Sequence, residues 1–90
     1  MRNIDYVLRT EKGDILVEKN AKEMVDGLID KLIVYRKKNK ITQQDISELT
    51  GISRANISRL EKKTYIPTLA VLMKYSNAIG KSLEINLKDL

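Results

Sequence analysis

The stretch that decides the fold is residues 42–62, which read TQQDISELTGISRANISRLEK. Thr42 and Ser53 are residue types that cap helix N-termini, and each precedes a short run with apolar residues at helical spacing. Gly51 lies between the two runs, where a residue that readily adopts positive φ ends a helix. The stretch therefore predicts two short helices joined by a turn.

The spacing inside this stretch is more specific than the helices themselves. Counted from Gln43, the small residue Ser47 is fifth, where the two helices would touch and a large side chain would separate them. Gly51 is ninth, at the turn, and Ile57 and Leu60 are fifteenth and eighteenth, on the core side of the second helix. This combination favours a helix-turn-helix over an arbitrary pair of amphipathic helices.

The positive charge of the chain is concentrated around the same stretch. The net charge is +5, and residues 36–63 hold eight basic and three acidic residues, whereas the two signs balance in the remainder. A local basic patch is typical of proteins that bind a polyanion such as nucleic acid. A solvated helix face would give the same count, so charge alone leaves both interpretations open.

Further helices are expected on both sides of the motif. Between residues 21 and 39 one helix face carries apolar residues: Ala21, Val25, Leu28, Leu32 and Tyr35, widened by Met24, Ile29 and Ile33. Residues 62–67 form a loop, after which Thr68 caps a last helix that Gly80 ends. The residues expected to be buried in the motif and in that last helix are Ile46, Leu49, Ile57, Leu60, Leu69, Leu72, Met73 and Ile79.

The two ends of the chain have β-like patterns. Two short apolar runs, residues 4–8 and 15–17, flank the sequence Glu11-Lys12-Gly13-Asp14, which favours a hairpin or arm within residues 1–19. Residues 82–87 alternate between polar and apolar, which predicts a half-buried strand within residues 82–90. Such a strand must pair with the hairpin or with the same strand of a second subunit, so we expect a dimerisation element there. Residues 20–81 would form the domain between these ends.

Several functional classes are disfavoured by composition. The chain has no Cys and no His, which excludes thiolate and imidazole metal sites and the commonest general base. Three carboxylates, Glu23, Asp26 and Asp30, stand at helical spacing, but without another ligand nearby a solvated face is the better interpretation. The scattered Tyr residues offer no stacking platform for RNA. We therefore expect that the protein is not an enzyme and that it binds no metal and no cofactor.

No run of residues is apolar enough to span a membrane, and residues 1–7 lack the apolar core of a signal peptide. We therefore expect a cytoplasmic protein with no membrane partner.

The motif resembles the Cro/C1-type (XRE) helix-turn-helix family of phage repressors and bacterial regulators. The resemblance covers residues 32–83 and rests on the Thr-Gln opening, the Gly turn, the Ile-x-x-Leu-Glu end and the later Pro67. It implies a mainly α, lambda-repressor-like domain of about four helices, to which the terminal strand and hairpin would be added. The family usually has Ala where Ser47 stands, and Gly where Lys63 stands. Lys lacks the free access to positive φ that Gly has.

The resemblance also implies roles for individual residues. Arg36 and Glu61 would form a structural ion pair that joins the long helix to the end of the recognition helix. The residues at the bases would be Arg54, Ala55, Asn56 and Arg59, and those at phosphates Gln43, Ser53, Ser58, Lys62 and Lys63.

Physical arguments favour Arg54 as the base reader. It stands at the start of the second motif helix, the end that meets base edges in such motifs, and Arg can bond guanine bidentately. Arg59 is five residues further on, about 140° around the helix, so the two side chains point in different directions. One would read a base while the other binds phosphate.

The leading hypothesis is a sequence-specific transcriptional regulator, a repressor, that binds double-stranded DNA as a homodimer. The alternative is the antitoxin of a toxin–antitoxin pair, which would neutralise a protein toxin and also repress its own operon. The resemblance implies this alternative because small members of the family often cover a toxin with an extension outside the motif. The first twenty residues of this chain would be that extension.

Overall fold

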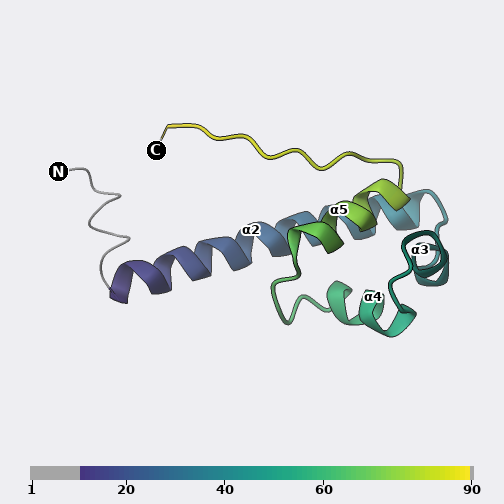
Figure 1. Cartoon of the computed structure of the whole chain (residues 1–90), viewed down its shortest axis with the longest axis horizontal. Helices are drawn as coiled ribbons and strands as arrows, with labels where there is room; N and C mark the ends of the chain where they lie inside the picture. The colour runs from purple at the N-terminus through teal and green to yellow at the C-terminus, as the bar shows by residue number, and fades with distance from the viewer. Residues whose placement is uncertain (1–10, 90) are drawn as a thin grey trace.

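The computed structural model describes residues 11–89 and contains four helices in this range (Figure 1): α2 (Glu11–Lys38), α3 (Gln43–Thr50), α4 (Arg54–Glu61) and α5 (Leu69–Ala78). The three shorter helices pack around the C-terminal half of α2. The expectation of a mainly α, four-helix domain is confirmed. None of the described helices is both long and apolar enough to cross a membrane.

The turn chemistry read from the sequence is confirmed. The Thr42 hydroxyl accepts a hydrogen bond from the Asp45 amide, and the Asp45 carboxylate accepts one from the Thr42 amide, which completes a capping box. Gly51 ends α3 with a φ of 77°. Ser53 and Thr68 cap α4 and α5 through their hydroxyl groups. These short-range hydrogen bonds set where three of the four helices begin.

The helix α2 begins ten residues before the expected start near residue 21, and this overturns part of the hairpin prediction. Residues 11–17, expected to form the turn and second strand, lie inside the helix, whereas residues 4–8 are outside the described range. The physical reason is cooperativity. Once a helix exists, each added residue gains a backbone hydrogen bond, whereas an isolated hairpin is marginal in water.

The hydrophobic core lies where the four helices meet. Its buried apolar residues are Ile29, Leu32, Ile46, Ile57, Leu60, Leu72, Tyr75 and Ile79. Three residues expected to be buried are instead exposed: Leu49, Leu69 and Met73. A helix of eight to ten residues buries only a narrow stripe, and Tyr75, which was not expected in the core, occupies that stripe in α5.

The buried face of α2 is also rotated from the expected one. It is centred on Ile29, Leu32 and Arg36, whereas Met24 is 76% exposed and Tyr35 is 39% exposed. The guanidinium of Arg36 accounts for the difference, because its partners on two other helices draw a charged residue into the interior.

The predicted strand at residues 82–87 is not formed. Residues 81–89 are neither helix nor strand, and they run back from α5 toward the N-terminal end of α2 (Figure 1). Leu83 packs against the core, but Ile85 and Leu87 are exposed. The correction has a simple cause: a strand needs a partner strand, and the described part of the chain offers none.

Candidate nucleic-acid interface

The helices α3 and α4 are the first and second helices of a helix-turn-helix. Ile46 of α3 and Ile57 of α4 are fully buried in the shared core, and the turn at Gly51 allows the second helix to cross the first. The buried side of α4 packs against α3 and α2, so its opposite side is left to solvent.

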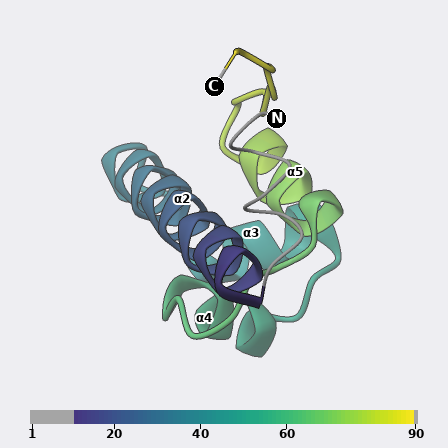
Figure 2. The ribbon, with the colours of Figure 1, turned by 90° about the vertical axis from the view of Figure 1, so that its left-hand side faces the viewer.

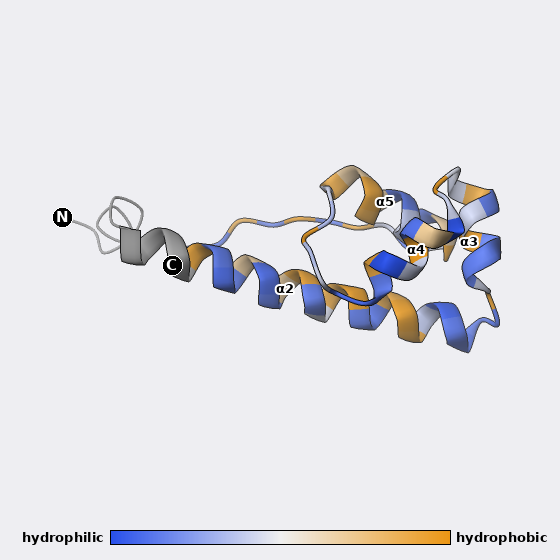
Figure 3. Cartoon of the chain, turned by 90° about the horizontal axis from the view of Figure 1, so that it is seen from below, coloured by the Kyte–Doolittle hydropathy of each residue, from blue (hydrophilic) through white to orange (hydrophobic). Residues whose placement is uncertain are grey.

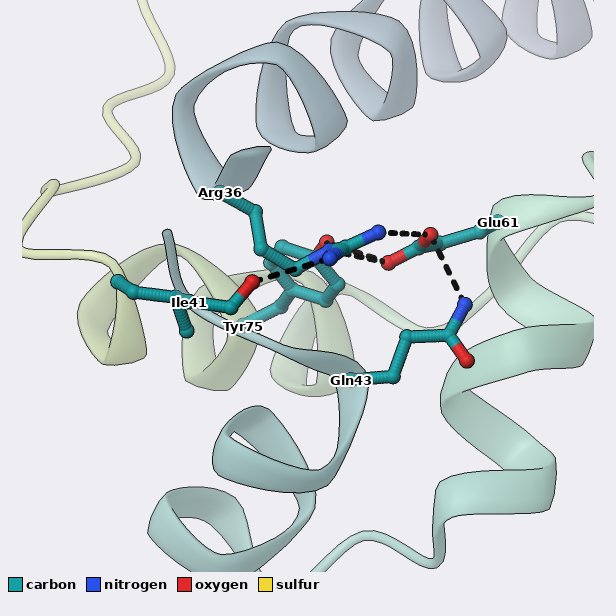
Figure 4. Close-up of polar contacts among 5 residues, drawn as sticks. All are labelled: Arg36, Ile41, Gln43, Glu61 and Tyr75. Atoms are coloured by element: carbon teal, nitrogen blue, oxygen red, sulfur yellow. Dashed lines mark hydrogen bonds and ion pairs between the residues drawn. The ribbon is translucent and has the colours of Figure 1, made fainter. Parts of the chain in front are cut away.

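A polar network holds the buried side of α4 (Figure 4). Arg36 donates two hydrogen bonds to the Glu61 carboxylate, from Nε at 2.9 Å and from Nη2 at 2.8 Å, so the structure brings together the two residues expected to pair. The Tyr75 hydroxyl donates to Glu61 at 2.6 Å and accepts from Arg36 Nε at 3.1 Å. Ile41 and Gln43 complete the network, through a backbone carbonyl and a side-chain amide. The end of α4 is thereby tied to α2, α3 and α5 at one point.

The electrostatics of this network favour the charged pair. Burial opposes the charged form of Glu61, but hydrogen bonds from Arg36, Tyr75 and Gln43 outweigh it and lower the Glu61 pKa. Burial and the neighbouring carboxylate raise the pKa of the Tyr75 hydroxyl, which keeps it protonated as a donor. Every buried side-chain polar atom among the described residues has a hydrogen-bond partner.

The exposed start of α4 lies beside a basic hollow. Arg54 is exposed and takes part in none of the ion pairs between described residues. The hollow, about 560 Å³ in volume, contains no acidic residue and is lined by Arg36, Lys37, Lys40, Ile41, Thr42, Gln43, Gln44 and Arg54. It therefore joins the basic end of α2 to the N-termini of α3 and α4, where free backbone amides and the helix dipole favour an anion.

The other residues expected at bases or phosphates differ in exposure and in the contacts that they already make. Ala55, Asn56, Arg59 and Lys62 are exposed. Ser53 uses its hydroxyl as the helix cap, and Ser58 is half-buried. The Arg59 guanidinium lies 4.9 Å from the centre of the Tyr65 ring, a cation–π contact that restrains where the guanidinium points.

Lys63, which is expected to meet a phosphate, forms an ion pair within the chain in this structure. Its Nζ lies 2.6 Å from Asp30 Oδ1 of α2, which raises the Lys63 pKa, and Lys22 Nζ donates to its carbonyl at 2.7 Å. Lys22 also pairs with Asp26, so two of the three carboxylates considered as cation ligands are occupied by lysines. Lys63 adopts a φ of 58°, the left-handed conformation for which the family uses Gly. The side chain thus fastens the loop to α2.

Three residues that line the basic hollow, Lys37, Lys40 and Gln44, were not predicted from the sequence, and neither were Tyr65 and Tyr75, which contact residues of α4. The charge count over residues 36–63 contained the signal for the two lysines. The tyrosines carried no such signal, because their partners are 6 and 14 or more residues away in the sequence.

The chain is similar to several known proteins. A family model described as helix-turn-helix matches residues 32–86. An uncharacterized HTH-type transcriptional regulator of Methanocaldococcus jannaschii is 34% identical over 55 residues, which cover 61% of this chain and 83% of that protein. One of Haemophilus influenzae is 36% identical over 59 residues, 66% of this chain and 60% of that protein.

A third relative, antitoxin HigA1 of Mycobacterium tuberculosis, is 30% identical over 61 residues, 68% of this chain and 41% of that protein. The chain thus spans most of the first relative and less than two thirds of the other two. No solved structure matches the chain.

Proposed function

The chain belongs to the Cro/C1-type helix-turn-helix family, and from that premise we propose that it is a dimeric, sequence-specific DNA-binding transcriptional regulator. The helix α4 enters the major groove, and Arg54 reads a base there. We propose the cytoplasm as its location, as expected for a DNA-binding regulator of this family of bacterial and phage proteins. We also propose that it is not an enzyme, since it has neither His nor Cys.

The observation that carries the proposal is the exposed Arg54 beside the basic hollow. In helix-turn-helix proteins the first residues of the recognition helix contact base edges, while backbone amides and basic side chains of the flanking elements contact phosphates. Here Lys37, Lys40 and the N-terminus of α3 surround Arg54 from one side. A phosphate in the hollow would therefore fix the register in which Arg54 meets the groove.

Titration of fluorescent DNA duplexes at several salt concentrations tests this proposal. Binding should weaken steeply with salt because bound phosphates release counterions, and Lys37→Ala and Lys40→Ala should each reduce the slope of log K against log salt by about 1. Lys74→Ala on α5, which is exposed and away from the hollow, is the matched control and should leave the slope unchanged. Equal slopes for all three variants would contradict a phosphate site in the hollow.

The dimer part of the proposal rests on residues 82–89. They form neither helix nor strand, and Ile85 and Leu87 expose apolar side chains, whereas Leu83 reaches the core. A second subunit would cover this segment and place two copies of α4 about one DNA turn apart. Deletion of residues 82–90 should give a monomer, and a truncated protein that stays dimeric would contradict this assignment.

An antitoxin role is the second candidate, favoured by the similarity to HigA1 and by one feature of the fold. The helix α2 extends about twenty residues before the start of the family match at residue 32, so its first half is available to a partner. A small toxin-like reading frame beside the gene, whose product co-purifies with this protein, would support this role. Failure of that product to bind would count against it.

A further inference from the structure

A groove lies between the middle of α2, the start of α5 and the C-terminal segment. It has a volume of about 510 Å³ and a mainly apolar lining that includes Met24, Leu28, Leu69, Leu83 and Ile85. Met24 is 76% exposed and Ile85 is 67% exposed, and Figure 3 shows apolar residues recurring along both segments. Exposed apolar residues gathered in one groove offer a partner a surface to bury. None of the residues that line the groove belongs to α4, which Figure 2 shows away from the C-terminal segment, so a partner in the groove would leave the recognition helix free.

Gly27 lines the same groove, and the fold of one chain does not explain it. It stands in the middle of a 28-residue helix, where Gly is less favourable than any residue except Pro. A Cβ added at this position would meet nothing within 4 Å, and the helix is regular there, so no other described residue requires the small side chain. A missing side chain allows the backbone of another element to approach closely. Gly27 therefore leaves room on this exposed face of α2 for the backbone of another element to approach closely.

The charges around Gly27 indicate what that element is. Glu23 precedes Gly27 by four residues and Lys31 follows it by four, so the three lie in one row on the helix surface. Both charged residues are exposed, line the groove and take part in none of the ion pairs between described residues. In an antiparallel arrangement of two such helices that cross at Gly27, each Glu23 faces the other helix's Lys31. The row is thus complementary to itself, as an interface between identical subunits requires.

We propose that the groove is occupied by a second copy of this chain, with two α2 helices antiparallel and crossing at Gly27. Glu23 of one subunit pairs with the partner's Lys31, and the same pair forms again across the two-fold axis. Met24 and Ile85 are covered at this contact, which continues onto the C-terminal segment. The inference rests on the proposed dimer and adds which helix makes it and in which orientation.

Charge reversal at both positions tests the pairing, with sedimentation equilibrium of the full chain as the measurement. Glu23→Lys or Lys31→Glu alone places like charges together at two symmetric contacts, and each should weaken dimerisation about tenfold or more. The double variant Glu23→Lys/Lys31→Glu restores opposite charges and should return the dimer constant to within about threefold of the original. Glu18→Lys, on the same helix but outside the groove, is the matched control and should have little effect.

A second variant tests the close approach. Gly27→Leu should weaken the dimer at least tenfold, while circular dichroism shows that the helix content is retained, because Leu is a better helix former than Gly. Dimerisation unchanged by Gly27→Leu, or a double charge reversal that fails to restore the dimer, would overturn the α2 contact.

The oligomeric states of the variants and of the unaltered chain distinguish the α2 contact from the proposed dimer. If the single reversals stay dimeric while deletion of residues 82–90 gives a monomer, the α2 contact is overturned and the dimer stands. If the unaltered chain is a monomer at all concentrations and also when bound to DNA, both the proposed dimer and the α2 contact are contradicted. The proposed sequence-specific DNA binding is tested separately, by comparing the DNA selectivity of the Arg54→Ala variant with that of the original chain.

Discussion

The two sides of the recognition helix α4 differ in how their residues are held. On the inner side, Ile57, Leu60 and Glu61 contact the core or the buried polar network, and their positions are fixed by several partners. On the outer side, Arg54 and Ala55 are exposed. The difference shows how an eight-residue helix can be both rigid and available: its inner side supplies the stability, and its outer side is left to contact another molecule.

The largest expected effect comes from breaking the inner side. Glu61→Ala leaves Arg36 buried without its anion, and loss of one partner of a buried ion pair typically costs about 3–5 kcal/mol. Chemical denaturation should show this loss in the free energy of unfolding. As a matched control, Glu48→Ala on α3, which is exposed, should change stability by less than about 0.5 kcal/mol. Equal effects of the two substitutions would show that the network does not hold α4.

The next largest effect is expected on the outer side, and in selectivity rather than stability. Arg54→Ala should remove about 1–3 kcal/mol of discrimination between a preferred and an altered duplex, the value of one bidentate contact with a base. The melting temperature should stay nearly unchanged because Arg54 is exposed. Lys62→Ala, by contrast, should weaken binding to all duplexes alike. Unchanged discrimination by the Arg54 variant would assign base reading to another residue.

A smaller effect, on the free energy of unfolding, is expected in the loop that follows α4. Lys63 has a positive φ, which costs a residue other than Gly about 1–2 kcal/mol, whereas an exposed ion pair such as Lys63–Asp30 is worth at most about 1 kcal/mol. Lys63→Gly should therefore raise the free energy of unfolding slightly, because relief of the backbone conformation outweighs loss of the exposed ion pair. A destabilised variant would show that the contact with Asp30 matters more than the backbone conformation.

The smallest effect, on DNA affinity, is expected between the inner and outer sides of α4, where Arg59 stacks on Tyr65. Replacement of the ring by Leu removes a cation–π contact worth about 0.5–1 kcal/mol at an exposed site, and Arg59 then becomes freer to move. DNA affinity should fall severalfold or less in the Tyr65→Leu variant, and Tyr65→Phe, which keeps the ring, should bind like the original chain. A loss shared by both variants would assign the role to the hydroxyl group instead.

The sequence was most informative where local chemistry decides the structure. The caps at Thr42, Ser53 and Thr68 and the turn at Gly51 act over a few residues, so their types and spacing were sufficient to predict α3, α4 and the start of α5. The family resemblance named Arg36 and Glu61 before the structure brought them together.

The remaining features depend on contacts between distant residues or between chains. Tyr75 joins Arg36 across 39 positions and Lys63 joins Asp30 across 33, and neither pairing has a local pattern. The start of α2 was placed too late because its first residues suit a strand, although helix propagation determines their conformation. The strand at residues 82–87 was predicted from alternation alone, which gives the faces of a strand but does not supply the neighbour it needs.

Selection of preferred sites from a pool of random DNA duplexes is the most direct test of the central claim that α4 reads DNA through its outer side. We expect enrichment of a two-fold symmetric sequence with half-sites about 10 base pairs apart, centre to centre. A guanine should be required at one position of each half-site, and that requirement should disappear when the selection is repeated with Arg54→Ala. Enrichment of no sequence would show that the chain does not read DNA, and enrichment of the same sequence by both proteins would show that Arg54 does not read the base.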